Sequence, residues 1–295
     1  MTALSAPPHS RRRERWWRSR TARRFMQHKL ALVGAVIIVA LALACILGPW
    51  LLPYDSLQID IRARFSPPFS GNHYLGTDPL GRDLAARLLE AGRISLLVGL
   101  FAMLLSTFVG ALVGVVAGYR GGWIGSVLMR LVDAFLAFPS IFLVLALAAV
   151  LKPSPAVITV IIALTSWMEV SRIVEAEVRS LREREFVLAG KMLGLSGSHM
   201  MFREVLPNAM GPIIVAATLT VARAILTEAY VSFLGYGIQP PLPSWGNMLN
   251  GAQQYLETAP WLAIVPGIAI TLAVTGFNFI GDGLRDALDV RAEGG

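Results

Sequence analysis

The feature that most constrains this chain is a run of apolar residues without a single charge, from Leu30 to Leu52. A helix needs about 20 such residues to cross the roughly 30 Å apolar core of a bilayer. An Arg-rich start before an apolar run is also the pattern of a secretory signal. This run is longer than the apolar region of a signal, and more such runs follow it. We therefore interpret residues 30–52 as the first transmembrane helix.

The composition indicates a membrane protein along the rest of the chain as well. Hydrophobic residues make up 55% of the sequence and charged residues only 15%, less charge than a soluble protein of this length needs on its surface. The net charge of +7 could indicate nucleic-acid binding, but the basic residues are concentrated in the first 30 positions. Basic residues beside an apolar run are typical of a cytoplasmic end. We interpret residues 1–29 as a basic cytoplasmic tail with Trp16 and Trp17 as interfacial anchors, and we expect no nucleic-acid partner.

Further apolar segments predict five more transmembrane helices. They lie at residues 94–119, 134–151, 153–168, 213–234 and 260–280. The predicted fold class is thus an all-α polytopic membrane protein with six transmembrane helices and both termini in the cytoplasm. Residues 53–93 form an extracytoplasmic loop, in which the helical periodicity of residues 83–93 predicts a short helix on the outer surface. Residues 94–290 form the core transmembrane domain.

The stretch 182–212 between two predicted spans is too polar to cross a bilayer, yet it has helical periodicity. Small and apolar residues are expected close together on a helix over residues 183–195, which would let the surface of another protein approach closely. Gly194 is expected to end this helix, Ser196 to cap the next one, and Pro207 to turn the chain back toward the membrane. The pattern favours a docking element. An amphipathic linker helix resting on lipid is the alternative.

Four segments, in order, resemble signature sequences of one family. The spacing Ala189…Gly194…Leu206-Pro207 is similar to the EAA loop of permeases in ATP-binding-cassette (ABC) importers, in which Leu188, Gly190 and Glu204 replace the usual Glu, second Ala and Ile. The other three segments are Leu75–Asp83 (LGTDPLGRD), Phe233–Gly246 (FLGYGIQPPLPSWG) and Asn278–Asp286 (NFIGDGLRD). Together they resemble the peptide/nickel branch, and within it the C-type permease subunit of dipeptide and oligopeptide transport systems. The family's last turn usually reads Leu-Asp-Pro, whereas this chain has Leu288-Asp289-Val290.

The resemblance implies a type I ABC importer permease fold and a defined set of partners. A second homologous permease would form the other half of the solute path, and an extracytoplasmic binding protein would deliver the solute. Two ABC ATPase subunits would bind ATP and Mg, so this chain would be a non-catalytic subunit in a bacterial plasma (inner) membrane. The EAA loop would form the coupling helix that seats in a groove of an ATPase. The residues to which this resemblance assigns ATPase coupling are Glu185, Phe186, Val187, Leu188, Ala189, Gly190, Gly194, Leu206 and Pro207.

No catalytic, cofactor-binding or metal site is expected in this chain. The sequence has no Gly-x4-Gly-Lys-[Ser/Thr] phosphate loop, and its four histidines lack metal-ligand spacing. Two charges fall within the fifth predicted span, Arg223 and Glu228. Because a lone charge in lipid costs several kcal/mol, they should face protein or water, either on the solute path, at a partner contact or in a structural pair. Arg130 and Asp133, one helical turn apart, are expected to pair structurally.

Two other classes of protein remain as rivals. A secondary transporter would have inverted repeats and broken helices near the midplane, and no repeat is found. A membrane-embedded enzyme would need clustered His, Asp or Glu at membrane depth. Within the importer class, di- or oligopeptides are the expected solutes, with nickel chelates, glutathione or opines as alternatives.

Overall fold

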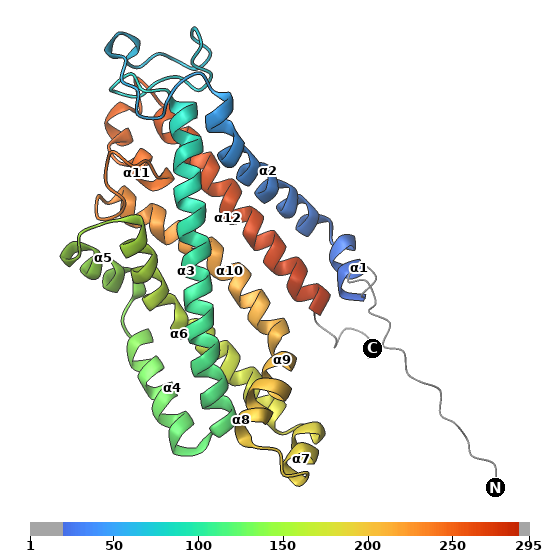
Figure 1. Ribbon diagram of the computed structural model, residues 1–295. Helices are drawn as coiled ribbons and strands as arrows, with labels where there is room; N and C mark the ends of the chain where they lie inside the picture. Colours follow the sequence, from blue (N-terminus) through green and yellow to red (C-terminus); the bar gives the residue numbers. More distant parts are fainter. Residues whose placement is uncertain (1–19, 289–295) are drawn as a thin grey trace.

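The computed structural model describes residues 20–288, which form a bundle of long helices without a β-sheet (Figure 1). Most of the predicted basic tail, with Trp16 and Trp17, lies outside the described residues, as do Asp289 and Val290. The helices are α1 (Arg20–Gln27), α2 (Lys29–Leu51), α3 (Leu84–Arg120), α4 (Gly122–Leu136), α5 (Ser140–Val150), α6 (Pro155–Arg182), α7 (Glu185–Met192), α8 (Gly197–His199), α9 (Leu206–Asn208), α10 (Met210–Phe233), α11 (Trp245–Leu249) and α12 (Trp261–Leu288). Two short 3-10 helices, Ile61–Ala63 and Ala252–Tyr255, and a π-helical segment, Met200–Val205, complete the set.

The structure has five candidate membrane spans, or the six predicted if one bent helix pair is counted, and the boundaries differ from the prediction. Within residues 20–288, five helices are each long and apolar enough to cross a membrane: α2, α3, α6, α10 and α12. The pair α4 and α5 passes the same test only together, with a bend of 77° between the two helices. Counting the bent pair as one span gives six, which confirms the all-α polytopic fold.

The first span, α2, packs along α12, and one of its ends is held by α3 (Figure 1). Gly34 allows the close approach to α12, since a Cβ there would lie 2.6 Å from the carbonyl oxygen of Gly276. Pro49 lies inside α2 and has no N–H to donate to the carbonyl of Cys45. Arg93 of α3 donates to that carbonyl instead, from Nε at 2.7 Å. A charged side chain thus satisfies a carbonyl that a proline leaves free.

The prediction of a separate surface helix over residues 83–93 is wrong, because these residues are the start of α3. Asp83 caps the helix by accepting a hydrogen bond from the N–H of Ala86 at 2.8 Å, and the helix then continues for 37 residues. No proline lies near the junction of Arg93 and Ile94, so nothing ends the helix there. A helix of this length measures about 55 Å, so it extends beyond a 30 Å apolar core and holds its charged first turns outside.

The third and fourth predicted spans also have different limits. The third, predicted as residues 134–151, is instead the bent pair α4–α5, which breaks before Ser140 because Pro139 disfavours helical geometry in the preceding residue. The fourth, predicted as 153–168, continues to Arg182 as α6, with Ser154 capping its start. Residues 169–182, which lie between the fourth and fifth predicted spans, are therefore helical. Asp133 forms an ion pair with Arg172 of α6 at 3.1 Å rather than with Arg130.

The most extensive helix contact in the bundle joins α3 to α6 and includes three glycines spaced four residues apart. A Cβ on Gly110 would lie 2.6 Å from the carbonyl oxygen of Trp167, and one on Gly114 would lie 2.6 Å from that of Ser171. Gly118 faces Glu175 in the same way, at 2.7 Å. The two helices run in parallel with their backbones in contact, the arrangement that small residues at this spacing allow in membranes.

This contact predicts that Gly114→Leu destabilises the folded chain. A side chain there must push apart two backbones, and such overpacking costs on the order of 1–3 kcal/mol. The matched control is Gly267→Leu in α12, where an added Cβ meets no atom within 4 Å. Thermal unfolding of the detergent-purified chain should show a lower Tm for Gly114→Leu and a Tm close to the parent's for Gly267→Leu. Equal Tm values for the two variants would contradict the account of the α3–α6 contact.

Candidate functional site

The segment predicted as a docking element forms a separate corner of the molecule at one end of the bundle (Figure 1). α6 has 28 residues and measures about 42 Å, so its last turns pass beyond a 30 Å apolar core and carry α7 outside it. Gly194 has a φ of +77° and ends α7. The N–H of Gly194 bonds to Lys191 and that of Leu195 to Gly190, the hydrogen-bond pair of a Schellman motif. Ser196 then caps the next helix through the N–H of His199.

The two sides of α7 differ in what they contact. Val187 and Gly190 face the chain itself, where Val187 is fully buried and a Cβ on Gly190 would lie 2.6 Å from the sulfur of Met200. The small size of Gly190 therefore serves internal packing and leaves no room for a partner. The exposed side carries Glu185, Ala189 and a group of large apolar side chains. These are Phe186, Leu188, Met192, Leu193 and Leu195.

The chain returns to the bundle through helical residues rather than through a turn at Pro207. The π-helical segment Met200–Val205 is followed directly by α9, which contains Leu206 and Pro207 near its first residues. Leu206 packs against the same buried cluster as Val187, whereas Pro207 is exposed.

Arg223 and Glu228 are both on α10 but lie in different surroundings. Glu228 is fully buried and accepts hydrogen bonds from Ser95 at 2.8 Å and Ser232 at 2.7 Å. Arg223 forms an ion pair with Glu169 of α6, and both side chains are more than half exposed. Glu169 lies one residue beyond the fourth span as predicted, which ends at Met168, so no sequence pattern indicated that it would pair with Arg223.

The Glu228 network holds the segment between α10 and α11, which carries the FLGYGIQPPLPSWG motif. Ser95 of α3 accepts the N–H of Trp245, and Ser232 accepts the N–H of Ile238. The indole of Trp245 is buried and donates to the carbonyl of Leu88 at 3.0 Å. The N–H groups of Ile238 and Trp245 and the indole of Trp245 thus join the segment to α3 and α10. The motif therefore builds a fixed cover over one end of the bundle.

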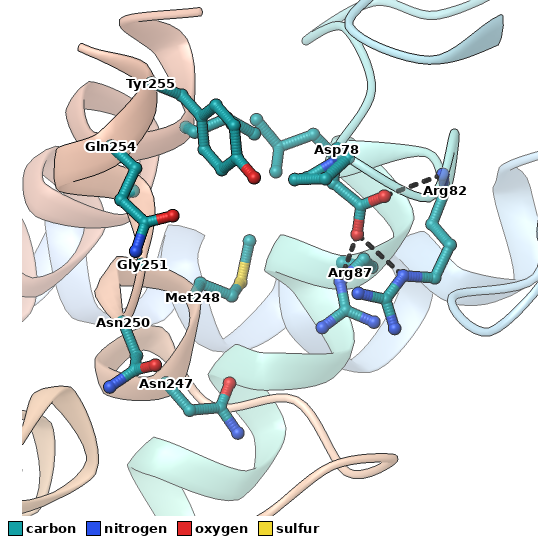
Figure 2. Close-up of a pocket in the computed structure, with 13 residues that line it drawn as sticks. Asp78, Arg82, Arg87, Asn247, Met248, Asn250, Gly251, Gln254 and Tyr255 are labelled. Carbon is teal, nitrogen blue, oxygen red and sulfur yellow. Dashed lines mark hydrogen bonds and ion pairs between the residues drawn. The ribbon is translucent and has the colours of Figure 1, made fainter. Parts of the chain in front are cut away.

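The LGTDPLGRD motif builds the loop at the same end and one wall of a cavity of about 210 Å³, shown in Figure 2. Asp78 accepts hydrogen bonds from the backbone N–H groups of Leu80 and Arg82 and from Arg82 Nε at 2.6 Å. Arg87 Nε lies 3.6 Å from Asp78 Oδ2 and forms an ion pair with it. Gly81 is required because a Cβ at its φ of +74° would overlap the carbonyl of Asp60. Asn250, Gln254 and Tyr255 form the opposite wall (Figure 2). The motif thus serves loop structure first and leaves a polar hollow beside it.

None of the described residues form a group of three or more His, Cys, Asp or Glu side chains placed to hold a metal ion. Cys45 is buried within α2. The features with functional chemistry in residues 20–288 are therefore the exposed apolar side of α7, the polar cavity at the opposite end of the bundle and the charged groups on α4, α6 and α10.

Comparison with known families matches two parts of the chain. Residues 110–294 match the family described as the inner membrane component of binding-protein-dependent transport systems. Residues 16–68 match the N-terminal TM domain of oligopeptide transport permease C. The first match covers more than half of the chain, and the second includes α2.

Similar proteins span nearly the whole chain. A Brucella suis biovar 1 protein, provisionally named a peptide permease, is 46% identical over 277 residues, 93% of this chain and 91% of that protein. The dipeptide transport system permease protein DppC of Alkalihalophilus pseudofirmus is 42% identical, covering 92% of this chain and 89% of the relative. The oligopeptide transport system permease protein OppC of Bacillus subtilis is 41% identical, covering 90% and 87%. The chain belongs to the family of inner membrane permease components of binding-protein-dependent transport systems.

Proposed function

We propose that this chain is the C-type permease subunit of an ATP-driven importer of di- or oligopeptides. It forms half of the solute path, and a second homologous permease forms the other half. Two ABC ATPase subunits bind ATP and Mg on the cytoplasmic side, and an extracytoplasmic binding protein delivers the peptide. The observation that carries the proposal is the identity of 40–46% with proteins named as peptide permeases, over at least 90% of this chain.

The exposed side of α7 supports docking of an ATPase. Leu193 and Met192 are 81% and 89% exposed, although they lie beyond the apolar part of α6. Large apolar side chains gathered on a surface outside lipid are typical of a protein contact. A helix that rested on lipid would instead need its apolar side level with the membrane interface, and the length of α6 carries α7 past that level.

The orientation follows from the basic tail. Arg and Lys residues beside the first span favour the cytoplasm, so the N-terminus and, after six spans, the C-terminus lie inside. α7 then lies in the cytoplasm, where ATP is available, and the cavity of Figure 2 opens at the outer end, where a binding protein arrives. The membrane is the bacterial plasma (inner) membrane.

The first test is ATP hydrolysis with and without the partner subunits. The purified chain alone should hydrolyse no ATP, whereas the complete complex should, at a rate that rises with peptide-loaded binding protein. Leu193→Lys should lower ATPase copurification and stimulated hydrolysis by about tenfold, because a lysine is costly to bury in an apolar groove. The matched control is Ile61→Lys, at an outer-loop position that is 70% exposed. ATPase activity of the isolated chain would refute the proposed function, and normal copurification of Leu193→Lys would refute the docking site.

The second test is orientation. In a Cys45→Ala background, single cysteines at Asn72 and Ser198, both exposed, should react with an impermeant thiol reagent from opposite faces of the membrane. Asn72 should react in intact cells and Ser198 only after the membrane is opened. Reaction of both from outside would contradict the topology.

A further inference from the structure

Four charged side chains from three helices lie next to one another and form what we call the charged strip. Arg223 of α10 pairs with Glu169 of α6, and Arg172 of α6 pairs with Asp133 of α4 at 3.1 Å. Glu169 and Arg172 are three residues apart on one helix and therefore neighbours on its surface. The signs alternate along the strip, and its net charge is zero.

The strip lies at membrane depth. Glu169 is near the middle of α6, and Arg223 is near the middle of α10. If α6 enters the roughly 30 Å apolar core at Pro155, Glu169 lies fourteen residues further on, about 21 Å into that core. A charged side chain in that region is costly when lipid surrounds it, and such residues face a protein interior or a water-filled path.

The exposure of the strip argues for water. The side chains of Arg223 and Glu169 are 57% and 53% exposed, and those of Arg172 and Asp133 are both 50% exposed. A dry cover would remove water from four charges at once, and the desolvation cost of buried ion pairs often exceeds their mutual attraction. Glu228, by contrast, is fully buried and has two hydroxyl donors. The strip has no such enclosure within residues 20–288, so a water-filled path satisfies it at least cost.

We propose that the charged strip lines the solute path and binds the two charged ends of a short zwitterionic peptide. This inference rests on the proposed peptide import. The ammonium of the peptide takes the place of a guanidinium beside Glu169 or Asp133, and its carboxylate takes the place of a carboxylate beside Arg223 or Arg172. The ends of an extended dipeptide are about 7 Å apart, and Cβ atoms at i,i+3 are about 5–6 Å apart. Neighbouring opposite charges on the strip therefore match the ends of one dipeptide.

The exchange of partners makes the binding transient. Each charge of the strip already has a partner in the chain, so the peptide replaces contacts rather than adding them. A path must bind its solute well enough to admit it and weakly enough to release it. A neutral strip of paired charges meets both conditions for a solute that carries one charge of each sign.

The first experiment measures whether water reaches the strip in the complete importer. Single cysteines replace Leu226, one turn from Arg223, and Ile173, one turn from Glu169, in the Cys45→Ala background. Both positions should react with an impermeant methanethiosulfonate reagent. Val36→Cys on α2, 68% exposed in the chain, is the control for a dry position and should not react. If the two strip positions are as unreactive as Val36→Cys, the strip lies in a dry contact and the proposal is wrong.

The second experiment measures whether the strip recognises charged peptide ends. Dialanine and its C-terminal amide, loaded on the same binding protein, are each compared with the wild-type rate for that compound. Arg223→Gln should slow dialanine about tenfold and the amide less than about twofold, because the amide has no carboxylate for Arg223 to bind. Glu169→Gln should slow dialanine, which has a free amino end, more than N-acetyl-dialanine, in which that end is blocked. Arg285→Gln on an exposed part of α12 should leave both rates unchanged.

The outcomes separate this inference from the proposed function. Equal slowing of the free and blocked compounds would mean that the strip only stabilises the fold or the permease pair, and it would overturn the inference while peptide import stands. Failure of the wild-type importer to carry any peptide would refute the peptide function itself. In that case the labelling of Leu226→Cys and Ile173→Cys would still report whether water reaches the strip.

Discussion

The backbone contact between α3 and α6 is the interaction on which the rest of the structure depends. Because Gly110, Gly114 and Gly118 of α3 have no side chains, their Cα atoms pack directly against backbone carbonyl oxygens of α6. Both helices are longer than the apolar thickness of a membrane, so the contact fixes features beyond both of its surfaces. The loop of residues 53–83 ends where α3 begins, and α7 lies just beyond the end of α6. The α3–α6 pair thus spans the distance between the cavity of Figure 2 and the proposed ATPase-docking surface.

Several polar residues lie inside the bundle because they provide hydrogen-bond partners for other buried polar groups. Arg93 supplies the donor that Pro49 removes from α2. Glu228 gathers Ser95 and Ser232, and their hydroxyls in turn accept backbone N–H groups from the segment that covers one end of the bundle. In a bilayer such groups find no water, so each requires a partner within the protein. The charged strip is the exception, since its side chains remain half exposed within residues 20–288, and we propose that the water of the solute path covers them.

The sequence was enough to predict an all-α polytopic fold, the position of the first span, the end of α7 at Gly194 and the cap at Ser196, because these depend on local pattern. It did not predict the bend at Pro139 or the start of α3 at Leu84, since apolar content alone cannot place a helix end. The largest consequence came from α6. Ending it at Met168, where charges begin, hid Glu169 and Arg172 in a supposed loop. The four-residue spacing of Gly110, Gly114 and Gly118 was visible in the sequence, but its partner helix was not.

The central claim is that this chain is half of a peptide path that is driven by ATP in partner subunits. The most direct measurement is uptake of radiolabelled dialanine into proteoliposomes that contain the complete complex. Accumulation above the external concentration should require both ATP and the binding protein, and it should stop when the ATPase subunits are omitted. Accumulation driven by an ion gradient, without ATP or ATPase subunits, would contradict the account and indicate a secondary transporter.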